Sequence, residues 1–239
     1  MLEHAASLRE GDSGPRGAVA GVLPACRPAF FDVCAAHQLT WWPDLGIGFY
    51  PVEAGIEPYD AAYFERFQKQ ADTTIGRALM QARVEFVNRH YQGALVDVGI
   101  GSGAFIERRN AAAEGETTFG FDVNPVAQEW LLQRDLFFDP YRVRVPAISL
   151  WDVMEHIPDF RALLARVSEW VFVSIPIFRD GQHVLASKHF RKDEHIWYFT
   201  SDGLIQAFGD CGFDVVATNT METELGREDI GTFAFRRRI

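Results

Sequence analysis

Three glycines at alternate positions follow a short apolar run near the middle of the chain. The stretch ALVDVGIGSGAFIERR, residues 94–109, places Gly99, Gly101 and Gly103 shortly after Asp97. Glycine adopts conformations and close approaches that a Cβ atom prevents, so this spacing after a strand indicates a turn whose backbone touches a ligand. In open α/β sheets, ligands bind outside the carboxyl ends of the strands. The glycines therefore favour an α/β fold with a binding site at that edge.

The sequence from residue 94 onward supports this fold class. Apolar runs expected as strands, ALVDVGI, TFGFDV, AISLWDV and WVFVSIPIF, alternate with helical patterns that include residues 125–133 and 159–170. Continuous apolar strands separated by helices predict a parallel sheet covered on both faces. The end differs, because a helix at 201–213 is followed by two strands, 213–220 and 231–239, with no helix between them. These two strands can pair antiparallel.

The sequence before this region divides into three segments. Residues 1–20 are rich in Gly, Ser, Ala and charge, which predicts disorder. Residues 21–58 are expected as an aromatic strand and loop extension with a hairpin-like pair of short strands. Trp41 and Trp42 in this extension either form a lid or extend the core.

Residues 59–92 form a helical lead-in. A first helix is expected at about 60–71, and the apolar spacing from Ile75 to Val87 predicts a second helix, which Asp72 or Thr73 can cap.

Composition argues against several classes of partner. The 239 residues carry 33 acidic against 23 basic side chains, a formal net charge of −10, and no cluster of Lys and Arg. We therefore expect neither nucleic acid nor a membrane surface as a partner. No apolar run approaches the roughly 20 residues that span a bilayer. Three cysteines in no paired spacing are expected as free thiols in a reducing cytoplasm.

The glycine turn has two interpretations when it is taken alone. Asp122 ends the next strand, where its carboxylate can accept hydrogen bonds from both hydroxyls of a ribose. The letters GIGSGA, followed by Asp122 about twenty residues on, also satisfy the fingerprint of dinucleotide-binding folds. Against a dinucleotide, Asp97 stands two residues before the first glycine, where such folds usually have an apolar residue. A nicotinamide-dependent oxidoreductase or epimerase would also need a Tyr-x-x-x-Lys pair, which we do not find.

Four motifs occur in order: VDVGIGSGAF, GFDVNP, ISLWDVMEHIPD and DEHIWYFTSDGLIQAFGDCGF. Together they resemble the class I S-adenosylmethionine-dependent methyltransferases over about residues 85–239, and DVMEHIPD is similar to small-molecule members such as the ubiquinone-pathway O-methyltransferases. The resemblance implies a Rossmann-like, seven-stranded sheet with an antiparallel last strand, as a methyltransferase domain at 93–239. It also implies transfer of a methyl group to an O or N atom of a small molecule, with S-adenosylhomocysteine as the product.

The resemblance also implies which residues bind the cofactor. Gly99, Gly101 and Gly103 would shape the loop around its methionine and ribose portions, with Asp97 beneath them. Asp122, with the adjoining Val123, would bind the ribose. Trp151 and Asp152 would flank the cofactor at the end of their strand.

The catalytic residues are expected around the DVMEHIPD motif. Asp152, Glu155 and His156 share one face if this piece takes a helical turn. His156 is expected either as the general base, since its ordinary pKa suits neutral pH, or as a packing group, and His195 as a second catalytic histidine. We expect no metal here. In the alternative, which some members of the resembled family suggest, Glu155 and His156 bind a divalent cation together with His189 or His195.

The segment from Ser187 to Thr200 is expected to contact the acceptor. His189, Trp197 and Tyr198 are the candidate substrate-binding residues, because aromatic rings can stack on a planar substrate. We expect a monomer or a homodimer. The competing interpretation is an inactive cofactor-binding module that acts through its aromatic N-terminal extension.

Overall fold

The computed structural model describes residues 26–51, 59–112 and 115–239, and the segment 1–20 predicted as disordered lies outside these ranges. Their helices are α2 (Ala61–Ala71), α3 (Thr74–His90), α4 (Ala104–Ala111), α5 (Pro125–Leu132), the 3₁₀ helix η2 (Met154–His156), α6 (Phe160–Leu164), α7 (Gly181–Ala186), α8 (Ser201–Asp210) and α9 (Met221–Glu224).

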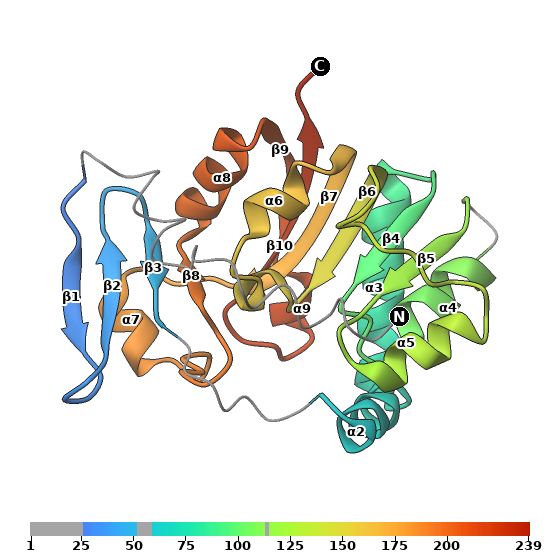
Figure 1. The fold of residues 1–239 in the computed structure, drawn as a ribbon, viewed down its shortest axis with the longest axis horizontal. Helices are drawn as coiled ribbons and strands as arrows, with labels where there is room; N and C mark the ends of the chain where they lie inside the picture. The colour runs from blue at the N-terminus through green and yellow to red at the C-terminus, as the bar shows by residue number, and fades with distance from the viewer. Residues whose placement is uncertain (1–25, 52–58, 113–114) are drawn as a thin grey trace.

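A six-stranded sheet forms the centre of the molecule (Figure 1). Its order is β5–β4–β6–β7–β10–β9, made of β4 (Leu95–Val98), β5 (Thr118–Phe121), β6 (Val145–Trp151), β7 (Val167–Pro176), β9 (Phe213–Asn219) and β10 (Ile230–Arg237). The first four strands in this order are parallel, and β10 is antiparallel to both of its neighbours. The predicted α/β fold with an antiparallel last strand is thus confirmed. Among the described residues this sheet has six strands and not the expected seven, and beyond β5 they add only an isolated bridge between Gly120 and Phe137.

Both faces of this sheet are buried, as its continuous apolar strands predict. Alternate residues of β6 and β7 point to opposite faces, so that Ile148 and Val171 pack with α6 and α8 while Ala147 and Phe172 pack with α3. In Figure 1, α6 and α8 lie in front of the sheet and α3 lies behind it.

A second sheet of four strands flanks the first, with the order β1–β2–β3–β8. It consists of β1 (Ala29–Asp32), β2 (Gln38–Trp42), β3 (Ile47–Phe49) and β8 (Trp197–Phe199), all paired antiparallel. The predicted hairpin is therefore only part of the arrangement, because β3 and β8 add two more strands. A bridge between Ile177 and Phe199 connects the two sheets.

The two tryptophans of the extension lie in the core. Trp41 and Trp42 are both buried, and Trp42 packs in the same apolar cluster as strands of the central sheet. Of the two alternatives that the sequence leaves open, the structure thus favours the extended core over the lid.

Two boundaries differ from expectation. The helix predicted at 159–170 ends at Leu164, because VSEWVFVSIP is a ten-residue strand whose inner residues pack on both faces of the sheet. The short helix α9 separates β9 from β10, where no helix was expected, yet the two strands pair antiparallel as predicted. The other helix starts match, with Thr73 capping α3 and Thr200 capping α8.

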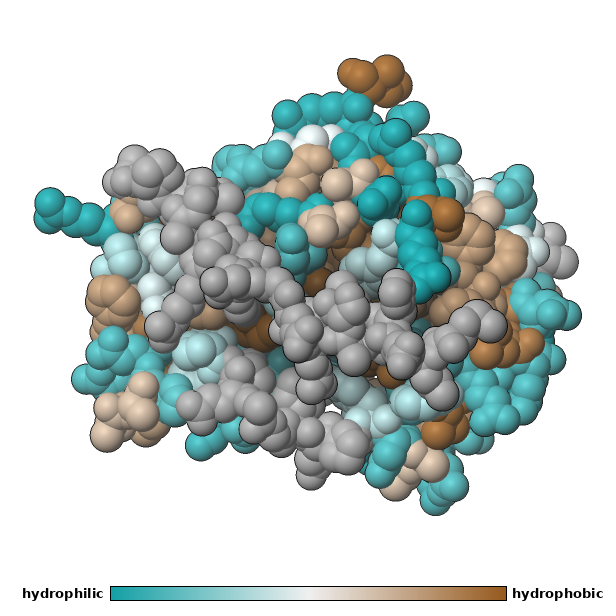
Figure 2. Space-filling view, in the orientation of Figure 1, coloured by the Kyte–Doolittle hydropathy of each residue, from teal (hydrophilic) through white to brown (hydrophobic). Residues whose placement is uncertain are grey.

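The surface seen in Figure 2 is mixed. Hydrophilic side chains cover much of this face, and apolar ones gather toward the end of the molecule that carries β5 and α5. Within the described residues, no helix is both long and apolar enough to cross a membrane.

Two glycines of α8 provide a matched test of how this helix packs. A Cβ atom on Gly203 would lie 2.2 Å from the carbonyl oxygen of Gly46, in the turn between β2 and β3, whereas one on Gly209 meets only the end of the Arg238 side chain at 3.4 Å. We expect Gly203→Ala to lower the free energy of unfolding by about 1–3 kcal/mol, because backbone has to move. Gly209→Ala should leave it unchanged or raise it by up to about 1 kcal/mol. Urea denaturation of both variants measures this, and equal effects would contradict the packing described here.

Candidate functional site

The three glycines form a tight turn between β4 and α4. All three have positive φ angles, 73° at Gly99, 57° at Gly101 and 79° at Gly103, which L side chains rarely adopt. Two of them also have no room for a Cβ atom, because a Cβ on Gly99 would lie 2.4 Å from Val153 and one on Gly103 would lie 2.5 Å from the ring of Trp130. The glycine turn that the sequence predicts at the carboxyl end of a strand is thus confirmed.

Asp122 lies against this turn. Its carboxylate is buried and accepts a hydrogen bond of 2.8 Å from the backbone N–H of Asn124. Burial raises the pKa of Asp122, against the lowering effect of backbone N–H groups of Asn124, Gly101 and Ile100. The side chain that caps α5 is that of Asn124 and not that of Asp122. Val123 beside it is 65% exposed.

Asp97 lies beneath the turn, inside the sheet. The Ser149 hydroxyl on β6 donates a hydrogen bond of 2.6 Å to its carboxylate. Burial raises the pKa of Asp97 to about 7, although the Ser149 hydrogen bond opposes the shift. A carboxyl group with a pKa of about 7 is only partly ionised at neutral pH, and a nearby positive charge favours its ionised form.

The end of β6 carries a buried network of charges. Asp152, at φ 59°, accepts hydrogen bonds from Arg83 at 3.2 Å and Arg227 at 2.9 Å. Both guanidinium groups also pair with Glu222 of α9, which is fully buried, and Arg83 bonds it at 2.7 Å. Burial would raise the pKa of Asp152, but Arg227 and Arg83 together hold it below its ordinary value. The Arg83 guanidinium also stacks over Trp151, 4.9 Å from the ring centroid.

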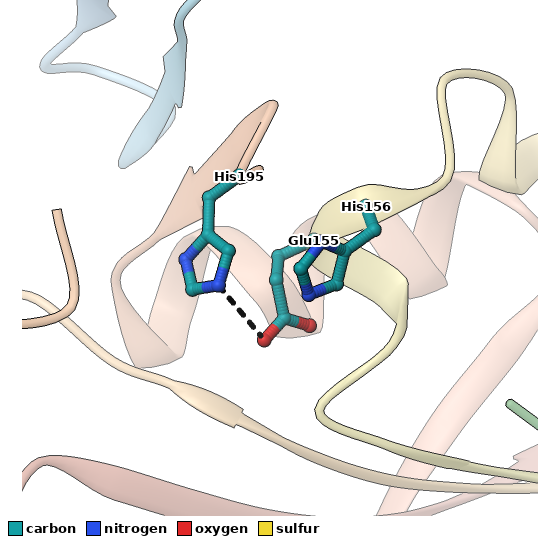
Figure 3. Close-up of side chains that lie close together, drawn as sticks. All are labelled: Glu155, His156 and His195. Atoms are coloured by element: carbon teal, nitrogen blue, oxygen red, sulfur yellow. Dashed lines mark ion pairs between the residues drawn. The ribbon is translucent and has the colours of Figure 1, made fainter. Parts of the chain in front are cut away.

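Glu155, His156 and His195 come together next to this network (Figure 3). One donor atom from each lies within 4.8 Å of the others, and the His195 Nε2 is 4.0 Å from Glu155 Oε1. The two imidazole rings stand perpendicular with centroids 4.7 Å apart. Glu155 and His156 come from η2, while His195 precedes β8. Asp152, predicted to share their face, points instead to the arginines.

Burial favours the uncharged form of each of the three side chains in this cluster. Burial raises the pKa of Glu155 well above its ordinary value, and the nearby Asp152 charge raises it further. Burial lowers the pKa of His156 to about 4 and, with His156 close by, that of His195 to about 3. Both imidazoles are therefore neutral and carry a free lone pair.

The predicted substrate residues lie in different surroundings. Trp197 is buried, its Nε1 donating at 3.0 Å to the carbonyl of Ile157, and Tyr198 is buried with its hydroxyl donating to the carbonyl of His195. His189 is partly exposed, and its Nε2 lies 2.8 Å from the carbonyl of Glu228. Of the histidines weighed for a cation, the structure thus brings His195 to the cluster and leaves His189 outside it.

Sequence reasoning missed Arg83, Glu222 and Arg227. Arg83 offered a signal, because it lies three residues before Phe86 on the apolar face of its helix, where a charge needs a partner. Glu222 and Arg227 offered none, since they lie in a segment between two strands that was not assigned a structure.

Comparison with known proteins identifies the fold. A family model described as a methyltransferase domain matches residues 67–218. Among solved structures, magnesium protoporphyrin IX methyltransferase (ChlM) of Synechocystis PCC 6803 with bound SAH superposes with a TM-score of 0.57 at 13% identity, over 75% of this chain and 96% of that one. No curated protein sequence gives a significant match.

Two further structures share the fold. The 1,6-didemethyltoxoflavin-N1-methyltransferase of Burkholderia thailandensis, solved with its substrate and S-adenosylhomocysteine, has a TM-score of 0.55 at 11% identity, over 88% of this chain and 99% of that one. A putative methyltransferase of Haloferax volcanii, in complex with the activator Trm112, has a TM-score of 0.56 at 13% identity, over 78% and 100%.

The environment of Asp97 predicts a pH-dependent stability. Because its pKa is raised in the folded state, the carboxyl group stabilises the fold fully below about pH 4, and this contribution is lost as the pH rises through 7. The variant Asp97→Asn keeps an acceptor for Ser149 and has no charge to bury. We expect the unfolding free energy of the variant, minus that of the wild type, to rise by up to about 1.4 kcal/mol per pH unit between pH 4 and 7.

Urea denaturation of both proteins across pH 4 to 8 measures this difference. The exposed Asp44, changed to Asn, serves as the control and should show no such trend. A stability difference that stays constant with pH would show that Asp97 ionises normally in the folded protein.

Proposed function

This chain belongs to the methyltransferase domain family, and from that premise we propose that it transfers a methyl group from S-adenosylmethionine to an oxygen or nitrogen atom of a small molecule. The observation that carries the proposal is the meeting of Asp122 and Asp97 at the glycine turn, at the carboxyl ends of β4 and β5. Structures of the same fold contain S-adenosylmethionine or S-adenosylhomocysteine, which supports this cofactor.

The residues present fit such a cofactor. The Asp122 carboxylate is buried beside the turn and can accept hydrogen bonds from two adjacent ribose hydroxyls. Asp97, whose pKa is about 7, gains by facing a cationic amino group, so it suits the methionine end. The backbone of the turn approaches closely because its glycines have no Cβ atoms. Val123 lies at the exposed rim of this site, where we propose that it contacts the adenosine.

Trp151 and Asp152 take a supporting part in this proposal. The carboxylate of Asp152 is occupied by Arg83 and Arg227, so it positions the turn after β6 rather than binding a ligand directly. The Nε1 group of Trp151 is buried and has no hydrogen-bond partner within the described part of the chain. An indole N–H in this state is a donor available to the cofactor or to a water molecule beside it.

In methyl transfer from a sulfonium, the main task of the protein is to align the acceptor with the methyl group. The cofactor supplies an activated methyl group on a sulfonium, and the chain has to orient the acceptor and help its proton leave. We assign the acceptor side to the cluster of His156 and His195, since Val153, two residues before Glu155, packs under Gly99 and so keeps η2 next to the turn. His189, Trp197 and Tyr198 flank this side in the segment before and within β8.

The acceptor class rests on analogy. Two of the enzymes named above, whose structures share this fold, are methyltransferases for magnesium protoporphyrin IX and for 1,6-didemethyltoxoflavin. Both of these acceptors are small planar molecules. A ubiquinone-type phenol is the acceptor that the DVMEHIPD motif suggests. A monomeric or homodimeric state, a cytoplasmic location and the absence of nucleic acid as a substrate stay predictions.

Calorimetric titration tests the cofactor. We expect S-adenosylmethionine to bind the wild type at micromolar concentration, and NAD to give no heat. Asp122→Ala should weaken binding about ten- to a hundredfold, the equivalent of hydrogen bonds to a charged acceptor. Asp44→Ala, at an exposed turn between β2 and β3, should bind like the wild type. Binding of NAD, or equal affinity in Asp122→Ala, would overturn the proposal.

A further inference from the structure

Three aromatic rings line one side of α2 and the residue before its cap. Tyr63 and Phe67 are four residues apart in the helix, and Tyr59 stands four residues before Tyr63, next to the capping residue Asp60. The ring centroids of Tyr59 and Tyr63 are 4.9 Å apart, and those of Tyr63 and Phe67 are 4.6 Å apart. All three side chains are only partly buried. We refer to Tyr59, Tyr63 and Phe67 as the aromatic stripe.

The stripe is not what attaches α2 to the core. Phe64 is the buried residue of this helix, and it packs in one apolar cluster with Ile100, Ile106, Ala127 and Leu131. The three rings of the stripe therefore form a second apolar face, partly open to solvent, beside the face that anchors the helix. Exposed aromatic surface next to polar groups is typical of a ligand site.

The stripe lies along the glycine turn and the end of β5. A Cβ atom on Gly101 would lie 3.5 Å from the ring of Phe67, so this ring covers the turn. At the start of the helix, the side-chain amide of Asn124 donates a hydrogen bond of 3.1 Å to the carbonyl of Asp60. Asn124 follows Asp122 by two residues and caps α5, and α2 lies beside α5 in Figure 1. The stripe thus borders the site that we propose for the cofactor.

Tyr59 lies between the two sides of the proposed site. Burial raises the pKa of Tyr59 to about 12, and the charges of Glu194 and Asp122 contribute to this shift. The charge of Glu155 contributes as well. The effect of a charge falls with distance and is screened by solvent, so the Tyr59 hydroxyl is near carboxyl groups of both sides. Asp122 belongs to the cofactor side, and Glu155 belongs to the cluster with His156.

The neighbouring side chains hold the Tyr59 ring in place. The rings of Tyr59 and Tyr63 meet edge to face at 83°. The guanidinium group of Arg66 stacks over Tyr63 at 5.0 Å from the ring centroid, and it lies 5.7 Å from that of Phe67. Aromatic pairs and cation–π contacts of this kind favour one arrangement of the rings. A ring that is already ordered loses little entropy when a ligand binds to it.

We propose that Tyr59, oriented by Tyr63, stacks on the methyl acceptor and so selects planar aromatic acceptors over saturated ones of the same size. This proposal rests on the proposed function, because it names the class of molecule that the acceptor side binds. The position of Tyr59 between Asp122 and Glu155 carries it, since the acceptor has to lie between the cofactor and the histidine cluster. Phe67, which covers the glycine turn, belongs to the cofactor side.

Calorimetric titration with two matched probes tests the proposal. The probe 2-naphthol is planar, and decahydro-2-naphthol has the same carbon skeleton and hydroxyl group but saturated, puckered rings. Both are titrated into the whole chain in the presence of excess S-adenosylhomocysteine, so that no methyl transfer takes place. We expect 2-naphthol to bind and the saturated probe to bind at least about three- to tenfold more weakly, because only a planar ring stacks on Tyr59.

Four variants locate the contact. Tyr59→Leu and Tyr63→Leu should each weaken the binding of 2-naphthol about three- to tenfold, because they keep an apolar side chain but remove a ring. Tyr59→Phe keeps the ring and should bind within about twofold of the wild type. Phe30→Leu removes an exposed ring of β1, away from the site, and should bind like the wild type. The affinity for S-adenosylhomocysteine should stay the same in all four.

Each outcome decides for or against the stacking contact. It is overturned if the wild type does not bind 2-naphthol, if both probes bind equally, or if Tyr59→Leu binds 2-naphthol like the wild type. Weaker binding of S-adenosylhomocysteine in Tyr59→Leu, with 2-naphthol unaffected, would place the ring on the cofactor and also contradict the proposal. If Tyr59→Leu does not fold, Tyr63→Leu decides in its place.

The proposed function can fail separately in the same experiment. A wild type that binds 2-naphthol through Tyr59, but binds neither S-adenosylmethionine nor S-adenosylhomocysteine, would overturn methyl transfer and leave a site for planar molecules. Cofactor binding without any dependence of 2-naphthol on Tyr59 would keep the proposed function and remove the stacking contact.

Discussion

A buried arginine holds together three parts of the molecule that are distant in sequence. Arg83 of α3 pairs with Asp152 after β6 and with Glu222 of α9, 139 residues further along the chain. Arg227 closes the arrangement by pairing with the same two acids, so two positive and two negative charges balance. Removing one partner of such a buried set typically costs about 3–5 kcal/mol, because an unpaired charge is left behind. These ion pairs also hold Asp152 in a left-handed conformation that a non-glycine residue rarely adopts.

The turn that begins at Asp152 lies between the glycine turn and the cluster of Glu155, His156 and His195. Val153 fills the space beneath Gly99, and only a glycine leaves room for it there. Two residues later, Glu155 and His156 meet His195. The glycine turn and the cluster of Glu155, His156 and His195 are therefore separated by about one turn of backbone, and the ion pairs of Asp152 with Arg83 and Arg227 hold that turn in place. A substitution of Arg83 or Arg227 should therefore alter the glycine turn and the histidine cluster together.

Much of this arrangement is readable from the sequence, and the reasons are physical. Strands such as WVFVSIPIF are apolar on both faces, which marks a buried parallel sheet, and the glycine spacing marks the turn. The features that the sequence does not reveal are strands too short to show a pattern and contacts between residues far apart in the sequence. Strands β3 and β8 have three residues each, too few to show a period, and the partners of Arg83 lie on other elements. The choice between His189 and His195 as the partner of His156 also required the fold, because both stand in one loop.

The pairing of β3 with β8 connects the backbone next to His195 to the N-terminal extension. His195 lies two residues before Trp197, which pairs with Phe49 of the N-terminal extension, and Tyr50 donates its backbone N–H to the carbonyl of Ile196. The region that the family model matches begins at residue 67 and so omits these contacts. A chimera that joins this methyltransferase domain to another protein's N-terminal segment would therefore inherit the glycine turn intact but lose the strand beside its second histidine. The extension and the loop at 187–200 are expected to be exchanged, or inherited, as one piece.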